Sequence, residues 1–206
     1  PLYGLVALGL VHPERIRRNS EARPGDRLIL GKGLGVGVLA AALKRDQLDS
    51  AGYAALLAST TTLNTAGPEL AELAGVHALT DVTGFGLAGH GLEMARGSGC
   101  SLRLHWPSVP LLDQARDLAA AGCITGASGR NWAACGDQVS LPAGFSPLEQ
   151  ALLCDPQTSG GLLVSCAPAA AGAVLEILRR HGCEQAAEIG QVEAAAGQPG
   201  LVVEIR

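Results

Sequence analysis

Short apolar runs that alternate with Ala- and Leu-rich stretches constrain the fold of this chain more than any other feature. The runs have the length and composition of buried strands, and they lie at residues 3–11, 27–30, 77–82, 162–166, 187–192 and 201–205. Residues 101–106 alternate apolar and polar side chains, as a half-buried strand does. The intervening stretches are typical of helices, at 38–44, 50–73 with a break near Gly67-Pro68, 87–96, 111–121, 147–153 and 169–181. This order predicts a single α/β domain (α+β mixed), in which helices pack as a layer on a mixed β-sheet.

The glycine content refines this prediction. Glycine accounts for 28 of the 206 residues, whereas aromatic residues make up only 3%. The core must therefore be aliphatic, and many turns must bring the backbone close to other backbone or to a ligand. Five glycines fall within residues 122–145, which we expect to be a long irregular stretch. Because the chain shows no repeat and no linker, we expect residues 1–206 to form one domain.

The charge balance and the cysteine spacing exclude several classes of protein. The net charge is −4, and without a basic stripe or many aromatic residues we expect no nucleic-acid partner. No apolar run reaches the ~20 residues that cross a bilayer, so we expect no membrane anchor. The six cysteines form no C-x-x-C pair and no Cys/His cluster, which excludes zinc and thioredoxin motifs. We expect these cysteines to be reduced and mostly buried, in a cytoplasmic protein.

A glycine cluster at residues 31–37 follows the 27–30 strand and opens a helix. Such a turn can hold a phosphate at the helix N-terminus. The dinucleotide-binding pattern fails here because its third glycine falls on Val36 or Val38, and the Walker A pattern fails because Gly33 follows Lys32. The cluster therefore favours close packing of a strand against a helix.

Residues 80–86, Thr-Asp-Val-Thr-Gly-Phe-Gly, form the first segment that could carry chemistry. Asp81 ends an apolar strand and precedes a Gly-x-Gly turn, so its carboxylate is expected at the sheet edge where α/β proteins bind ligands. A carboxylate flanked by hydroxyls suits Mg²⁺ held beside nucleotide phosphates. The alternative is that Asp81 caps the helix that starts near Gly86. The residues alone leave both interpretations open.

Residues 155–161, Asp-Pro-Gln-Thr-Ser-Gly-Gly, form the second such segment. Its hydroxyls and glycines offer several donors to an anion, and its candidate phosphate-binding residues are Thr158, Ser159 and Gly160. The alternative is a polar turn in which Asp155 and Thr158 bond to the nearby backbone. We give ordinary roles to two further residues, His90 as a core or capping histidine and Arg130 as a solvated loop residue.

Taken in order, these segments resemble selenophosphate synthetase (selenide, water dikinase), a family of the aminoimidazole ribonucleotide synthetase-like superfamily. The resemblance is to the C-terminal half of that family and runs over nearly the whole chain. It is carried by the segments at 80–86 and 155–161 and by shorter matches, among them Arg23-Pro24-Gly25-Asp26 and Arg130-Asn131. The 155–161 segment points to the selenophosphate branch.

The resemblance implies a reaction in which ATP, selenide and water give selenophosphate, AMP and phosphate. It implies a Mg²⁺ cofactor for which Asp81 is a ligand from this domain, with ATP as a substrate. It also implies a homodimer formed through an N-terminal domain, and the fold of the C-terminal domain of aminoimidazole ribonucleotide synthetase-like enzymes.

The family's nucleophile, nucleotide loop and other metal-binding Asp residues belong to an N-terminal half that has no counterpart among these residues. We therefore assign no catalytic residue and expect residues 1–206 alone to be inactive. Because no Met precedes Pro1, we expect the chain to come from a longer protein. Two alternatives stay open: a non-enzymatic anion-binding or interaction module, and the C-terminal domain of another ATP-dependent synthetase of the superfamily.

Overall fold

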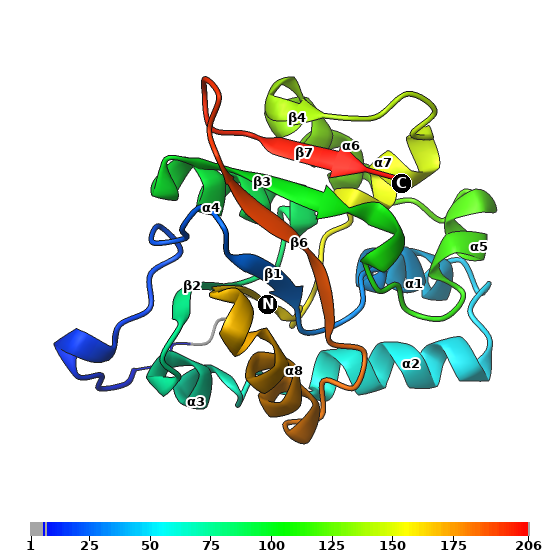
Figure 1. Cartoon of the computed structure of the whole chain (residues 1–206). Helices are drawn as coiled ribbons and strands as arrows, with labels where there is room; N and C mark the ends of the chain where they lie inside the picture. The colour runs from blue at the N-terminus through cyan, green and yellow to red at the C-terminus, as the bar shows by residue number, and fades with distance from the viewer. Residues whose placement is uncertain (1–5, 7, 206) are drawn as a thin grey trace.

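Within residues 6 and 8–205, which the computed structural model describes, seven strands form one sheet in the order β2-β5-β1-β6-β3-β7-β4 (Figure 1). The strands are β1 (Arg27–Leu30), β2 (Val76–Asp81), β3 (Cys100–His105), β4 (Val139–Ser140), β5 (Leu162–Cys166), β6 (Ala187–Ala194) and β7 (Leu201–Glu204). From β2 to β3 each neighbouring pair is antiparallel, while β7 pairs in parallel with both β3 and β4. The predicted mixed sheet is therefore confirmed.

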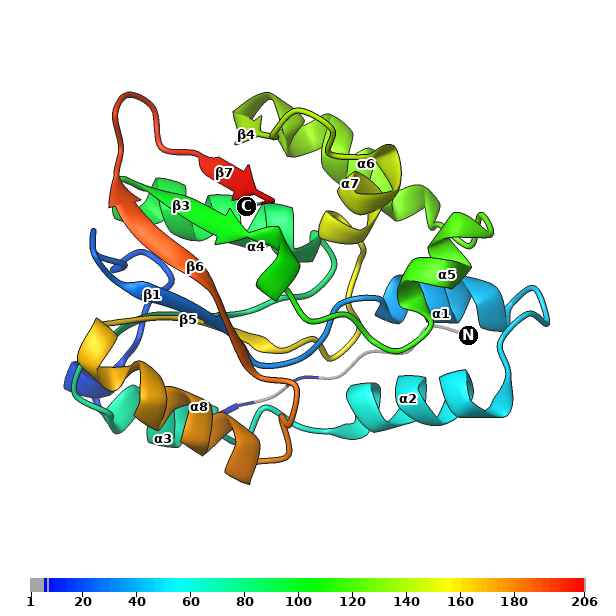
Figure 2. The same cartoon turned by 45° about the vertical axis from the view of Figure 1, so that its right-hand side comes forward.

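Helices cover both faces of this sheet. They are α1 (Val36–Leu43), α2 (Ser50–Thr61), α3 (Gly67–Glu72), α4 (Gly86–Ser98), α5 (Ala115–Ala120), α6 (Gly126–Cys135), α7 (Pro147–Leu153) and α8 (Ala171–Arg180). Figure 2 shows α3 and α8 on one side of the sheet and α4, α6 and α7 on the other. In the part of the chain described here, no helix is long and apolar enough to cross a membrane.

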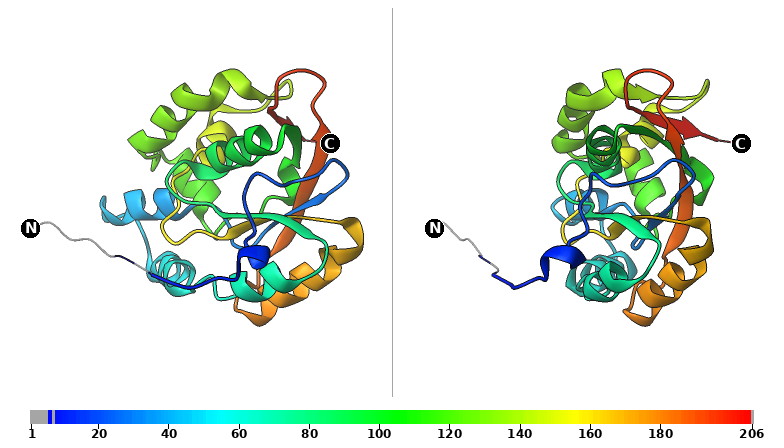
Figure 3. Two further views of the ribbon diagram at one scale, coloured as in Figure 1. Left: turned by 90° about the vertical axis from the view of Figure 1, so that its left-hand side faces the viewer. Right: turned by 60° about the vertical axis from the view of Figure 1, so that its left-hand side comes forward.

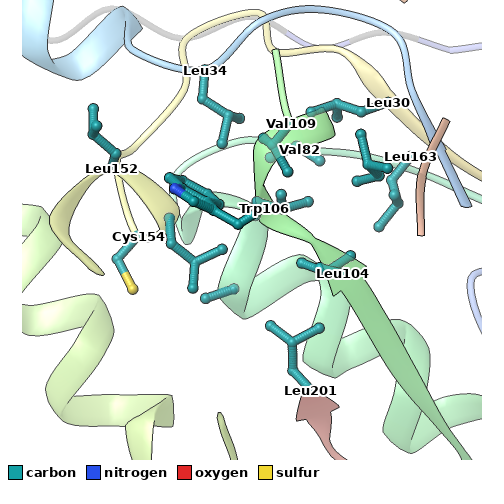
Figure 4. Close-up of a cluster of buried hydrophobic side chains, with 14 of the residues drawn as sticks. Leu30, Leu34, Val82, Leu104, Trp106, Val109, Leu152, Cys154, Leu163 and Leu201 are labelled. Atoms are coloured by element: carbon teal, nitrogen blue, oxygen red, sulfur yellow. The ribbon is translucent and has the colours of Figure 1, made fainter. Parts of the chain in front are cut away.

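The alternation of side chains along β1 divides the core in two. Leu28 and Leu30 point into the larger cluster, with Leu87 of α4, whereas Ile29 points into the smaller cluster beneath α8. Figure 4 shows aliphatic side chains of the larger cluster gathered around Trp106. The aliphatic core predicted from the composition is confirmed, since Trp106 is the one buried residue among the Phe, Trp and Tyr side chains of the described chain.

A buried carboxylate joins the strands that carry the two candidate segments. Asp26 precedes β1 and accepts hydrogen bonds from Ser165 Oγ of β5 at 2.6 Å and from His77 Nδ1 of β2 at 2.8 Å. Arg23 donates to His77 Nε2 at 3.2 Å, which places the single proton of a neutral His77 on Nδ1. This network fixes β2 and β5 relative to β1.

The strand expected at residues 3–11 is not found. Residues 1–5 and 7 lie outside the described part, and residues 6 and 8–11 adopt no strand conformation. Val6, Leu8 and Leu10 are 88%, 96% and 105% exposed, because no sheet edge of this domain pairs with them.

The prediction of a long irregular stretch at 122–145 is wrong in its centre. Residues 126–135 form α6, whose N-cap Thr125 accepts a hydrogen bond from Ser128 N at 3.2 Å. Glycine lowers helix propensity by only about 1 kcal/mol, so a cap and packing against α4 and α7 outweigh two glycines. Arg130, expected in a loop, lies exposed on this helix.

Candidate functional site

The two segments singled out in the sequence lie side by side. β2 and β5 are antiparallel neighbours, and their register sets Asp81 opposite Leu162. The loop before β5 therefore lies against the turn after β2, where Gln157 N donates to Thr83 O at 3.0 Å and Val82 N donates to Gly161 O at 2.9 Å. This pairing brings residues 80–86 and 155–161 to one edge of the molecule.

Asp81 is available to a ligand. It is the last residue of β2 and is exposed, and its carboxylate has no hydrogen-bond or ion-pair partner among the described residues. The alternative role as a helix cap does not hold, because α4 begins after Phe85 without a side-chain cap.

A magnesium ion would find only part of its ligands here. No three His, Cys, Asp or Glu side chains of the described residues are grouped to hold a metal. Mg²⁺ is commonly held by one or two carboxylates together with water and phosphate oxygens. The free carboxylate of Asp81 fits one such ligand, and the remainder would come from water, nucleotide or protein outside the described part.

The three candidate phosphate-binding residues differ in their exposure. Thr158 is exposed and Ser159 is partly buried with a φ of 52°, whereas Gly160 is buried. A Cβ at Gly160 would overlap the carbonyl oxygen of Val82, so this position requires glycine for close approach of the two segments. Of the three residues, only Thr158 and Ser159 are therefore accessible at the surface.

The Asp155 carboxyl bonds to backbone groups far away in the sequence as well as to a side chain of its own loop. Its Oδ2 accepts hydrogen bonds from Gly37 N at 2.9 Å and Val38 N at 3.4 Å, at the N-terminus of α1. Gln157 Nε2 donates to the same oxygen at 3.0 Å. Burial raises the pKa of Asp155 to about 7, against the lowering effect of these hydrogen bonds. The local-turn alternative is wrong for Asp155, because α1 draws the carboxyl away.

The same contact decides the role of the 31–37 glycine cluster. The N-terminus of α1 is occupied by the Asp155 carboxyl, so a phosphate would have to displace it. A Cβ at Gly37 would overlap Asp155 Oδ1. The cluster serves close packing, as predicted, but the element packed against α1 is the 155–161 loop rather than a strand.

Lys32 holds the other end of this loop. Its Nζ is buried and donates to Ser159 O at 2.6 Å, to Thr62 O at 2.6 Å and to Ser59 O at 3.2 Å. Two of these carbonyls end α2, where a positive charge is favourable. Burial lowers the pKa of Lys32, with a smaller opposing effect from the nearby Cys183.

Asn131 and His90 fix the turn after β2. Asn131 Nδ2 donates to Gly84 O at 2.9 Å and to Cys154 O at 3.0 Å, which joins the two segments from the side of α6. His90 is buried, and its Nε2 lies 3.2 Å from Thr83 Oγ1. The prediction of a structural His90 is confirmed.

Sequence reasoning did not identify Asp155, Lys32 or Asn131 as the residues that shape the site. Each of these side chains forms hydrogen bonds with backbone atoms that are distant in the sequence. Every residue has such backbone atoms, so no sequence pattern marks the bonded ones. The one available signal was Lys32, a lysine directly after a buried strand in a chain with only two lysines. A buried lysine must find several acceptors, and a loop rich in carbonyls can supply them.

Known proteins resemble the chain in sequence over nearly all of its length. The family described as AIR synthase related protein, C-terminal domain, matches residues 23–201. The chain is 60% identical over 192 residues to a selenide, water dikinase of Burkholderia ambifaria, a match that covers 93% of this chain and 54% of the relative. The chain thus spans about half the length of the curated relatives it matches.

Solved structures share the fold. The hydrogenase maturation protein HypE matches with a TM-score of 0.69 at 24% identity, over 95% of this chain and 54% of that one. HypE in complex with ATP matches with a TM-score of 0.68 at 23% identity, over 92% and 50%. At this identity the likeness establishes the fold, and it confirms the fold class expected from the sequence.

Proposed function

We propose a function for this chain, which belongs to the family of AIR synthase related proteins and matches the C-terminal domain of that family. In our proposal it is the C-terminal half of a selenophosphate synthetase, which makes selenophosphate, AMP and phosphate from ATP, selenide and water. The similarity to selenide, water dikinases carries this proposal. A free carboxylate beside a hydroxyl-rich loop is the local feature that supports it.

In this proposal Asp81 gives one ligand to Mg²⁺ at the edge of the β2–β5 pair. When bound, the metal would offset the negative charge of the nucleotide phosphates. Lys32, Asp155 and Asn131 would position the loop, since Lys32 bonds to Ser159 O, Asp155 bonds to Gly37 N and Asn131 bonds to Cys154 O. Thr158, Ser159 and Gly160 remain our candidates for contact with phosphate.

We further propose that residues 1–206 supply only part of the active site. By themselves they should not turn over ATP, because the family resemblance places the nucleophile and the nucleotide loop in an N-terminal half. The homodimer would form through an N-terminal domain. A cytoplasmic location is supported by the six cysteines, which are all free and buried.

Asp81→Asn tests the metal role directly. The variant is made in this chain joined to the upstream half of the Burkholderia ambifaria relative, and AMP release is measured as a function of Mg²⁺ concentration. Loss of one ligand charge should lower turnover at limiting Mg²⁺ by roughly tenfold or more. The melting temperature should change little, because the exposed Asp81 carboxylate has no hydrogen-bond or ion-pair partner among the described residues.

The matched control is Asp117→Asn, which removes the same charge from an exposed position on α5. It should leave the Mg²⁺ dependence unchanged. If Asp81→Asn and Asp117→Asn behave alike at limiting Mg²⁺, Asp81 is not a metal ligand.

A further inference from the structure

α2 (Ser50–Thr61) exposes an apolar face to solvent. Tyr53 and Leu57 are 45% and 43% exposed, and Ala54 and Ala58 are exposed as well. Residues at these spacings lie on one side of a helix, so the four side chains form a continuous stripe, which we call the α2 face. Figure 2 shows α2 along the margin of the molecule. The α2 face is therefore open to a partner.

The composition of α2 does not suit a helix that faces water. None of its 12 residues is charged. A surface helix normally carries charged and polar side chains opposite its buried stripe, whereas a helix that is apolar all round is buried. α2 packs on α1 and buries Gly52 and Leu56 on its inner side. Its outer side is equally uncharged, which is typical of a surface that another protein segment covers.

The exposed apolar surface continues beyond the end of the helix to the candidate site. Leu63, two residues after α2, is 68% exposed. The next residue, Asn64, donates a hydrogen bond to Gly160 O at 2.8 Å, and Lys32 joins the end of α2 to the same loop. The C-terminal end of α2 is therefore tied to the 155–161 loop. A protein segment that completes the candidate site at this loop also reaches the α2 face.

A pocket beside the α2 face offers a place for a side chain of a partner. The pocket has a volume of about 360 Å³ and lies between α2 and the turns at Leu112 and Gly182. Ala58 belongs to the α2 face and also lines this pocket, together with Ala55. Side chains inserted into pockets near the centre of an interface contribute much of the binding energy. The α2 face and the pocket therefore suit a partner with an apolar, uncharged surface.

We propose that the α2 face is the docking surface for the upstream half of the whole protein, which meets it with an apolar and uncharged surface. This inference rests on the proposed function, in which the upstream half supplies the nucleotide loop and the remaining ligands of the metal at Asp81. The match covers 54% of the Burkholderia ambifaria relative, which leaves a domain-sized part of that relative outside it.

The place of the N-terminal residues favours the upstream half as the occupant. Figure 3 (left) shows residues 8–12, in dark blue, on the same side of the molecule as α2, in cyan. In this segment Leu8 and Leu10 are 96% and 105% exposed. A second copy of this chain is the rival occupant, but it would bring no nucleotide loop to Asp81. An upstream half joined on this side can cover the α2 face and complete the candidate site together.

The test measures the rate at which hydroxyl radicals oxidise Tyr53, followed by mass spectrometry. It compares residues 1–206 with the joined protein, in which the same residues follow the upstream half of the Burkholderia ambifaria relative. The oxidation rate of Tyr53 should be lower by roughly fivefold or more in the joined protein, because the docked half keeps water from it. Ile205, which is exposed beyond β7, is the internal control and should be oxidised equally in both proteins.

Leu57→Asp places a charge in the α2 face. In the joined protein it should return the oxidation rate of Tyr53 to the rate found in residues 1–206, because burial of an unpaired charge opposes docking. Ile205→Asp is the matched control and should leave Tyr53 protected in the joined protein. Leu57 is exposed in this domain, so the substitution should leave the folding of residues 1–206 intact.

The proposal is overturned if Tyr53 is oxidised at the same rate in both proteins, or stays protected in Leu57→Asp. It is also overturned if Tyr53 in residues 1–206 alone becomes protected as their concentration rises, since a second copy is then the occupant. The measurement needs no turnover of ATP. A joined protein that protects Tyr53 without releasing AMP contradicts the proposed function alone, and one that releases AMP with Tyr53 unprotected contradicts this inference alone.

Discussion

Asp155 is the residue on which the geometry of the candidate site depends most. It lies fully buried between α1 and the 155–161 loop, with Oδ2 on the helix N-terminus and Oδ1 without a hydrogen-bond partner. A buried carboxyl is less costly in its neutral form, and burial accordingly raises its pKa to about 7. In the unfolded chain the same carboxyl titrates near its ordinary value of 3.8.

This shift predicts a pH-dependent stability. Between about pH 4 and 7 the folded state keeps a proton that the unfolded state has lost, so stability is highest at the acid end and falls as pH rises. Asp155 can lower the free energy of unfolding by at most about 1.4 kcal/mol for each pH unit in this range. The free energy of unfolding should be measured with urea at pH 5 and at pH 8. From pH 5 to pH 8 the unaltered chain should lose stability relative to Asp155→Asn.

The comparison with Asp46→Asn supplies the control. Asp46 is exposed after α1 with a φ of 55°, a conformation that Asn adopts readily. The difference in free energy of unfolding between Asp46→Asn and the unaltered chain should be the same at pH 5 and at pH 8. A constant difference between the unaltered chain and Asp155→Asn at both pH values would contradict the raised pKa.

At the scale of residues, the sequence indicated candidate residues whose positions are set locally and missed residues that act through contacts across the chain. Asp81 was identified because a strand end and a Gly-x-Gly turn determine its position locally. Asp155, Lys32 and Asn131 act on backbone atoms between 23 and 127 residues away, and this distance leaves no pattern in the sequence.

At the scale of elements, glycines on helices have opposite consequences according to what lies beside them. Gly37 is in the first turn of α1, where a Cβ would overlap Asp155 Oδ1 and approach Pro156 O to 2.9 Å. Gly129 is inside α6 and exposed, and a Cβ there would contact nothing within 4 Å. The first glycine is required by packing, and the second only lowers helix propensity.

These environments predict opposite results for the same substitution. Gly37→Ala should destabilise the chain by about 1–3 kcal/mol, because it forces α1 and the loop apart. Gly129→Ala should stabilise it by about 0.5–1 kcal/mol, because alanine favours the helix. Urea midpoints measure both, and a stabilising Gly37→Ala would show that Asp155 does not sit on α1 as described.

Element boundaries were predicted best where periodicity and caps agree. α7 begins and ends as expected because Ser146 and Glu149 form a capping box before an apolar run. α2 ends earlier than expected, since Thr60, Thr61 and Thr62 bond back to carbonyls of the preceding turn and Lys32 holds Thr62 O. The predicted strand at 3–11 is not formed by residues 6 and 8–11, because no strand of the described sheet pairs with them.

At the scale of the whole molecule, the described part of the candidate site offers one free carboxylate, so the proposed metal would need further ligands from elsewhere. The chain spans about half the length of its curated relatives, and its matched family is a C-terminal domain. The exposed side chains of Val6, Leu8 and Leu10 would be costly in water, and burial of each would contribute about 1.5–3 kcal/mol. Both features agree with a domain that functions together with an upstream half.

The most direct test measures AMP release from ATP in the presence and absence of selenide. It compares residues 1–206 alone with the same residues joined to the upstream half of the Burkholderia ambifaria relative. We expect selenide-dependent AMP release from the joined protein and none from residues 1–206. AMP release by residues 1–206 alone, or a folded joined protein that shows no selenide dependence, would contradict the account.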